Sequence, residues 1–122
     1  MELTTGELLT LCTTAALQAG ADNATSRSLA EATVRAEQRS RSAVGVAHLP
    51  DYLDALHVGA IDGTAVPDIT ACGAVVRVNA RGGTTQRAFE AAVTDLVDAV
   101  QSTGTGVLTG GNAYTVGELV DY

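Results

Sequence analysis

His48 and Tyr114 are the residues best suited to chemistry in this sequence. His48 directly precedes Leu49-Pro50. An imidazole titrates near neutral pH, so it suits either a proton-transfer group or a contact to a carboxylate. The competing interpretation is a half-buried histidine bonded to the backbone. Tyr114 follows a predicted strand, at the kind of strand end where binding residues collect in mixed folds. We therefore treat both as candidate catalytic residues.

Three arginines are candidate substrate-binding residues. Arg39 and Arg41 stand close together in the sequence, and the guanidinium fork matches a carboxylate, phosphate or sulfate. Arg81 precedes Gly82-Gly83, where glycines let the backbone approach an anion closely, so it could join the same clamp. The competing interpretations are a solvated helix end or an ion pair with Glu37 for the first two, and an ordinary turn for Arg81.

Asn112 and Thr115 are further candidate substrate-binding residues, one on each side of Tyr114. Their amide and hydroxyl groups offer hydrogen bonds to a small ligand. Simple turn chemistry for Gly110-Gly111-Asn112 explains the same residues equally well. Both interpretations stay open at the level of the sequence.

The charge balance excludes several classes of partner. The chain of 122 residues has a net charge of −7, and its 7 basic side chains are all arginine. Because nothing here neutralises a row of phosphates, we expect no nucleic-acid partner and no docking on an anionic membrane surface. No window approaches the roughly 18 consecutive apolar residues that a membrane span needs, so no span is predicted. The expected ligand is a small-molecule substrate.

Cysteine and histidine usage predicts a cytoplasmic protein without a metal site. Cys12 and Cys72 lie far apart with no histidine neighbour, so we expect two buried free thiols in a reducing compartment. His48 and His57 are the only histidines, and neither belongs to a cluster of metal ligands. The N-terminus lacks a basic segment followed by an apolar run, so no secretory signal is expected.

Three helices are predicted in the first half of the chain. Thr4 and Glu7 form a capping box ahead of a helix that ends at Gly20. Asp22 or Asn23 caps a second helix, over residues 24–39.

The third helix is predicted over residues 45–56, with Pro50 in its first turn, where the missing N–H costs little. We expect Tyr52 to lie in the core and Asp51 on a solvated face. The apolar positions recur at helical spacing: Leu49, Tyr52, Leu53 and Leu56.

The second half predicts a strand, a helix and a second strand. Residues 74–78 form the first strand, after a loop that includes Pro67-Asp68. Thr84 or Thr85 caps the helix, and residues 107–109 form the second strand. Chemistry-bearing residues therefore precede the third helix and follow both strands.

Together these elements predict an α+β fold in a single domain over residues 1–122, with a helical part over 1–60 and a strand–helix–strand part over 70–122. Residues 116–122 are typical of the start of another helix. Two strands alone do not form a stable sheet, and a core of Ala, Val and Leu is thin. We therefore expect a second protein subunit to complete the sheet.

Most of the chain resembles the N-terminal third of the malate/L-lactate dehydrogenase family, which includes ureidoglycolate dehydrogenase and the ketimine reductases. Beyond the two-helix start, residues 36–52, AEQRSRSAVGVAHLPDY, are similar to the family's ADLRGHDSHGVxRLPxY. Residues 79–86, NARGGTTQ, resemble DGDGGLGQ, and residues 111–117, GNAYTVG, stand in the place of NSNHFG. The resemblance implies the family's fold and a pocket for a 2-oxo-acid-like substrate.

The chain departs from the family pattern at its chemical positions. The family's acid–base histidine falls at Val44, and the neighbouring Asp and Ser fall at Ser42 and Ala43. The arginine that would hold a substrate carboxylate falls at His48. Family members are about three times longer, and most of their cofactor-binding domain has no counterpart here. We therefore expect no cofactor on this chain, and NAD(P) only if a partner chain supplies the site.

These departures favour one functional hypothesis over two others. The first is a subunit of a heteromeric biosynthetic enzyme of bacterial specialised metabolism that acts on a small anionic amino-acid-like substrate. Its reaction would be non-redox: an elimination, or a cyclisation in which an amine displaces an anionic leaving group. The first alternative is one half of a split NAD(P)-dependent 2-oxo-acid or ketimine reductase. The second is a non-catalytic pseudoenzyme that partners a full-length relative.

Overall fold

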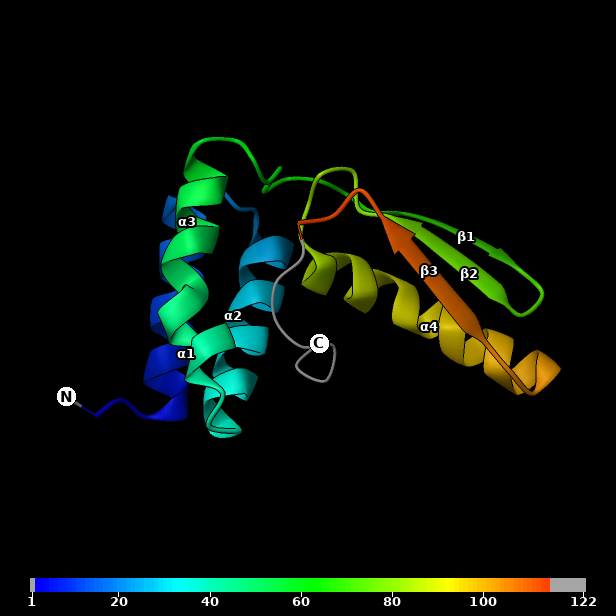
Figure 1. Cartoon of the computed structure of the whole chain (residues 1–122), viewed down its shortest axis with the longest axis horizontal. Coiled ribbons are helices and arrows are strands. Elements are labelled where there is room, and N and C mark those ends of the chain that lie inside the picture. The colour runs from blue at the N-terminus through cyan, green and yellow to red at the C-terminus, as the bar shows by residue number, and fades with distance from the viewer. Residues whose placement is uncertain (1, 115–122) are drawn as a thin grey trace.

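The computed structural model describes residues 2–114. Its helical half and its sheet half follow one another in the chain, as Figure 1 shows. The predicted α+β class is confirmed. Thr115 and the helix predicted over 116–122 lie outside the described residues. The elements are α1 (Thr5–Gln18), α2 (Asn23–Gln38), the 3₁₀ turns η1 (Ser42–Val44) and η2 (Val46–His48), α3 (Leu49–His57), β1 (Asp68–Cys72), β2 (Val75–Asn79), α4 (Thr85–Thr103) and β3 (Val107–Gly111).

The long helices begin at the side-chain caps that the sequence predicts. Thr4 and Glu7 form the expected capping box before α1. The Asp22 carboxylate accepts the Thr25 amide at 2.8 Å at the start of α2, and the Thr84 hydroxyl accepts the Arg87 amide at the start of α4. Each cap satisfies an amide that has no partner within its helix.

The third helix begins later than predicted, because α3 starts at Leu49 and not at Gly45. Two 3₁₀ turns occupy residues 42–48 instead. Pro50 does lie in the first turn of α3, as expected. Gly45 has φ −101° and ψ −129°, which lies outside the helical region, so a continuous helix cannot begin there. The apolar stripe itself starts at Leu49 and lies within α3.

The sheet has three strands in the order β1-β2-β3, with β1 antiparallel and β3 parallel to β2. The strands predicted at 74–78 and 107–109 correspond to β2 and β3. The prediction of a loop through Pro67-Asp68 was wrong in one respect, since it missed β1. This short edge strand is mostly exposed, so it lacks the apolar alternation that marks a half-buried strand.

Two apolar cores hold the molecule together, one among α1, α2 and α3 and one between α4 and the sheet. Val76 and Val78 of β2 face α4, while Arg77 and Asn79 are exposed. Cys12 is buried as expected, but Cys72 is exposed, so the prediction of two buried thiols was wrong for Cys72. That residue ends the edge strand β1.

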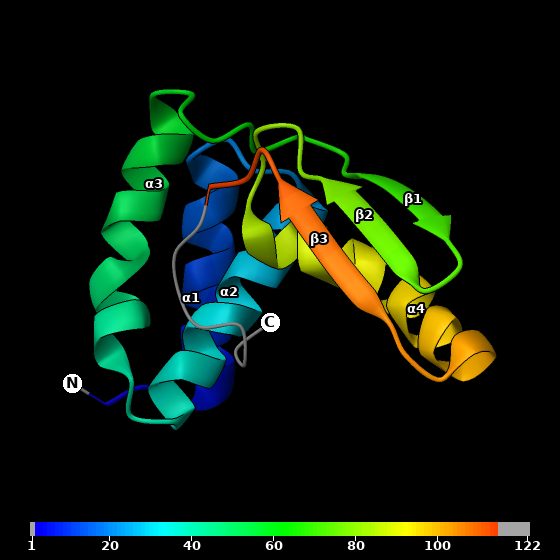
Figure 2. The same cartoon turned by 45° about the vertical axis from the view of Figure 1, so that its right-hand side comes forward.

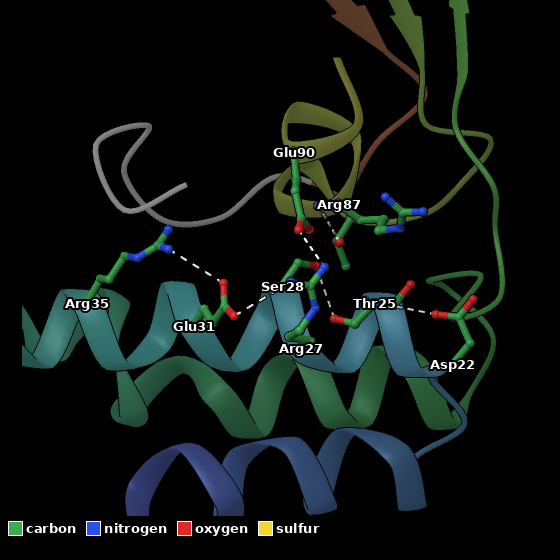
Figure 3. Close-up of polar contacts among 9 residues, drawn as sticks. Asp22, Thr25, Arg27, Ser28, Glu31, Arg35, Arg87 and Glu90 are labelled. Carbon is green, nitrogen blue, oxygen red and sulfur yellow. Dashed lines mark hydrogen bonds and ion pairs between the residues drawn. The ribbon is translucent and has the colours of Figure 1, made fainter. Parts of the chain in front are cut away.

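Helix α2 connects the two cores, because it packs on α1 and on α4. Figure 2 shows α1, α2 and α3 together on one side and α4 under the sheet on the other. Arg27 of α2 and Glu90 of α4 form an ion pair at 2.6 Å, drawn in Figure 3 with the neighbouring Glu31 and Arg35 pair. No helix in residues 2–114 is long and apolar enough to cross a bilayer.

Candidate functional site

Three aromatic rings form a row at the junction of the helical half and the sheet half. The ring of His48 at the end of η2 meets Tyr52 of α3 edge-on, with centroids 5.5 Å apart. The ring of Tyr114, which follows β3, lies 5.6 Å from Tyr52 on a tilted plane. The two candidate catalytic residues, His48 and Tyr114, therefore contact the same tyrosine.

The central ring of this row is fixed from α4. Tyr52 is 3 % exposed, and its hydroxyl oxygen accepts a hydrogen bond from Gln86 Nε2 at 2.9 Å. Gln86 itself is buried in the first turn of α4. A buried tyrosine needs a partner for its hydroxyl. The amide of Gln86 thus holds Tyr52 in place between α3 and α4.

His48 carries one paired and one unpaired nitrogen. Its Nδ1 lies 3.0 Å from Asp51 Oδ2, one helical turn along α3. Its Nε2 has no accessible surface and no hydrogen-bond partner within the part of the chain that the structure describes. A buried polar atom without a partner costs free energy. Among the atoms of this row, Nε2 of His48 is therefore our candidate for hydrogen bonding or proton transfer to a ligand.

Tyr114 is held by the start of α4. Its amide donates to Gly83 O at 2.9 Å, and its carbonyl oxygen accepts from the amide of Thr85 at 3.2 Å and from the hydroxyl of Thr85 at 3.1 Å. These bonds continue the parallel pairing of β2 and β3 past the ends of the strands. The chain after β3 is thereby directed toward Tyr52.

Arg81 and Asn112 lie together at the same end of the parallel strands. Asn79 Oδ1 accepts from the amide of Arg81 at 2.9 Å and from Nδ2 of Asn112 at 3.3 Å. Both residues have positive φ, 53° and 56°, a conformation that asparagine tolerates better than arginine. The guanidinium of Arg81 forms an ion pair with Asp68 of β1.

The structure does not bring the three candidate arginines together. Arg81 adjoins the N-terminal end of α2, because Asp22 and Asp62 bond to Gly63 and Gly82 there. Arg39 and Arg41 follow the other end of that helix, which has 16 residues and so spans about 24 Å. The three-arginine clamp is therefore not formed, and only Arg39 and Arg41 lie at the end from which η1 and η2 lead to His48.

Asp62, in the loop before β1, is tied locally to Thr64. Its Oδ1 accepts from the amide and from the hydroxyl of Thr64, each at 2.9 Å. These bonds lower the pKa of the Asp62 carboxyl below its ordinary value. The carboxylate thus stabilises the loop that lies between α3 and β1.

An apolar cleft of about 400 Å³ opens between α4 and β3. No arginine lines it, so the phosphates of a dinucleotide would find no cation in it, and the residues that line it do not fit a complete NAD(P) site. The residues 2–114 also contain no group of three or more histidine, cysteine or acidic side chains that could hold a metal ion. The lining residues are Val78, Thr85, Ala88, Phe89, Leu96, Leu108, Gly110, Gly111, Asn112 and Ala113.

The candidate site residues from the sequence did not include Asp51, Tyr52 or Gln86, but the sequence expectations for the first two are confirmed: the Asp51 side chain is 62 % exposed, and Tyr52 is buried with its hydroxyl bonded to Gln86. Asp51 was expected on a solvated face and Tyr52 in the core. The spacing of His48 and Asp51 at i and i+3 is a signal that could have found the pair, since such residues are neighbours on a helix. Gln86 gives no comparable signal, because its partner Tyr52 lies 34 positions away.

Comparison with known proteins places these features in a family. A family model described as malate/L-lactate dehydrogenase matches residues 3–122. The chain is 38 % identical over 81 residues to a Δ1-pyrroline-2-carboxylate/Δ1-piperideine-2-carboxylate reductase of Pseudomonas syringae pv. tomato, covering 66 % of this chain and 24 % of that protein. It is 35 % identical over 96 residues to the protein of that name from Pseudomonas putida, covering 78 % and 28 %.

The fold agrees with this similarity. The crystal structure of Δ1-piperideine-2-carboxylate reductase from Pseudomonas syringae pv. tomato superposes with a TM-score of 0.89 at 30 % identity, over 93 % of this chain and 34 % of that one. The chain thus spans about a quarter of the length of the curated relatives and about a third of the solved one.

Proposed function

The chain belongs to the malate/L-lactate dehydrogenase family, and we propose that it forms the substrate-side segment of an NAD(P)-dependent reductase of cyclic ketimine acids or 2-oxo acids. The similarity to the two Pseudomonas imine reductases carries this proposal. The remaining two thirds of such an enzyme, including the cofactor site, would come from further sequence or from a second subunit.

The first functional hypothesis, a non-redox elimination or cyclisation, was wrong. Its main support was the replacement of the family's acid–base histidine by Val44. The two curated relatives and the solved structure reported above are reductases by name, and none of them supports a cyclase. The alternative hypothesis, a split reductase, fits these relatives.

In this proposal His48 supplies the proton of the reduction. The hydride would be supplied by a nicotinamide held outside the described residues. When protonated, Nε2 of His48 would donate its proton to the nitrogen or oxygen of the substrate and be left as part of a neutral imidazole. Arg39 and Arg41, near the end of α2 from which the chain leads to His48, would hold the substrate carboxylate. Tyr114 and Asn112 would line the side that faces the strand ends, whereas Arg81 is paired with Asp68 of β1 and is given no contact to the substrate. Thr115 remains a candidate by sequence alone.

The two free cysteines accord with a reducing compartment, so we propose a cytoplasmic location. A nicotinamide-linked reductase meets its cofactor pool there. The hydride donor itself would be held outside the described residues, because the cleft beside α4 offers its phosphates no cation.

The test is a reductase assay on the protein isolated by a tag in its native assembly. Oxidation of NADPH and NADH is followed with Δ1-piperideine-2-carboxylate, Δ1-pyrroline-2-carboxylate and pyruvate. We expect substrate-dependent oxidation that His48→Gln lowers by about 100-fold, since positioned proton transfer contributes about 10²–10⁴-fold. His57→Gln, at the exposed end of α3, serves as the matched control and keeps full activity. Absence of nucleotide oxidation with every substrate would refute the proposal.

A further inference from the structure

We propose that Asp51 is the positioning residue of this site, which fixes the tautomer and direction of His48 so that Nε2 faces the substrate. The inference rests on the proposed function, because it assigns a role in proton transfer. Its starting point is the 3.0 Å contact between His48 Nδ1 and Asp51 Oδ2. The sequence placed Asp51 on a solvated helix face, and its side chain is indeed 62 % exposed, so the contact with His48 is open to water on the Asp51 side.

The contact determines which nitrogen of His48 carries the proton. A carboxylate only accepts hydrogen bonds, so the partner nitrogen Nδ1 must be the one that donates. In the neutral ring the other nitrogen, Nε2, is then bare and able to accept. When the ring is protonated, Nε2 becomes the donor. Asp51 thus leaves Nε2 available to accept a proton from a ligand when the ring is neutral and to donate one when the ring is protonated.

The environment of Nε2 fits this role. The atom has no accessible surface and no partner within residues 2–114, although a buried ring nitrogen normally finds one. The His48 side chain as a whole is 26 % exposed, whereas Nε2 itself is covered, so a substrate atom would have to displace the groups that cover Nε2 in order to bind it. A substrate nitrogen or oxygen would satisfy an atom that the fold leaves without a partner.

The ring is held from a second direction as well. Tyr52 meets His48 edge-on at an interplanar angle of 89°, and Gln86 of α4 anchors the Tyr52 hydroxyl. Rotation of the imidazole about its own axis would break the bond to Asp51 on one edge and the packing against Tyr52 on the other. The position of Nε2 is therefore set by α3 and, through Tyr52, by α4.

Nitrogen NMR of the histidines tests the inference without any need for activity. The full chain contains only two histidines, His48 and His57, so ¹⁵N-histidine labelling of this chain gives two ring systems, and His57→Gln assigns them. We expect neutral His48 to carry its proton on Nδ1. In Asp51→Asn the amide N–H of the new side chain donates to Nδ1, so the proton moves to Nε2. Asp54→Asn, an exposed residue on the same helix, leaves the tautomer unchanged.

Steady-state kinetics on the native assembly provide the second measurement. Asp51→Asn should lower kcat at least about tenfold, as loss of the correct tautomer removes much of a contribution of about 10²–10⁴-fold, while KM changes little. Asp51→Glu should restore part of kcat, and Asp54→Asn should match the wild type. If neither the His48 tautomer nor kcat changes in Asp51→Asn, the inference is overturned, even if the protein is a reductase. A tautomer that follows Asp51 in a protein without nucleotide oxidation would instead uphold the role of Asp51 and refute the proposed function.

Discussion

Cys12 and Cys72 differ in their exposure to solvent, which governs the access of a reagent to the thiol. Cys12 is 1 % exposed in the core of the helical half, where burial, with a smaller effect of Glu37, raises the pKa of its thiol. Cys72 is exposed at the end of β1. Since the thiolate is the reacting species, burial disfavours reaction at Cys12, while the exposed Cys72 is open to a reagent.

We predict that a thiol reagent modifies Cys72 at once and Cys12 only when the chain unfolds. Ellman's reagent should therefore release one equivalent in native buffer and two in urea. Cys72→Ser should remove the fast phase and leave the urea-dependent one. A fast phase that persists in Cys72→Ser would contradict the burial of Cys12.

At the scale of single residues, the sequence marked His48 and Tyr114 as candidates by their type, and these stay predictions, but it did not indicate the groups that contact them. Imidazole and phenol groups stand out by type, whereas Asp51 and Gln86 act through geometry. Arg81 has a partner that the sequence did not indicate. Its neighbouring glycines suggested an anion clamp, but the antiparallel strand β1, which was not predicted, supplies Asp68 as its partner.

At the scale of elements, Gly63 marks the closest approach between the α1–α2 turn and the loop after α3. A Cβ at this position would lie 2.7 Å from Gly20 O and 2.8 Å from Ala21 Cα. Both are backbone atoms, which cannot move aside as a flexible side chain can. The Gly63 carbonyl oxygen also accepts the amide of Asp22 at 2.8 Å.

Gly63→Ala should therefore destabilise the fold by about 1–3 kcal/mol, the usual cost of overpacking. Gly6→Ala is the matched control, because Gly6 lies in the first turn of α1 with nothing within 4 Å of its Cβ position. That change should leave stability unchanged or raise it by up to about 1 kcal/mol. Urea unfolding followed by far-UV circular dichroism measures both. Equal urea midpoints for the two variants would contradict the prediction, because they would show that the loop after α3 shifts to accommodate the added methyl group.

The sequence predicts elements well where local chemistry decides their ends. Thr4, Asp22 and Thr84 cap the helices that they were expected to cap. It predicts them poorly where a neighbour decides. Strand β1 exists because β2 pairs with it, and its own residues are mostly exposed. A helix start at Gly45 is excluded by the backbone of that residue, which lies outside the helical region, and the sequence pattern gives no sign of this.

At the scale of the whole molecule, only the central strand of the sheet is hydrogen-bonded on both of its edges within residues 2–114. β2 lies between β1 and β3, whereas the outer edge of β3 has no partner strand in residues 2–114. Parallel strands are usually found inside larger sheets. This open edge, beside the apolar cleft along α4, is where we propose that the rest of the enzyme or a second subunit adds to the sheet.

Hydrogen exchange of the backbone amides measures the difference between the central strand β2 and the open edge of β3. In the chain alone, the amides of β2 should exchange slowest among the strands, and the amides of β3 that face away from β2 should exchange fast. In the native assembly the β3 amides should gain protection while those of β2 change little. Exchange at β3 that is as slow alone as in the assembly would show that nothing adds at this edge.

The aromatic row also gives the chain an intrinsic tyrosine fluorescence signal. The sequence has no tryptophan and 3 tyrosines, so its ultraviolet emission comes from those phenols alone. Two of them, Tyr52 and Tyr114, lie 5.6 Å apart where the helical half meets the sheet half. Within this chain, intrinsic fluorescence therefore samples that junction directly, beside His48, and Tyr52→Phe should alter the emission spectrum without adding any foreign dye.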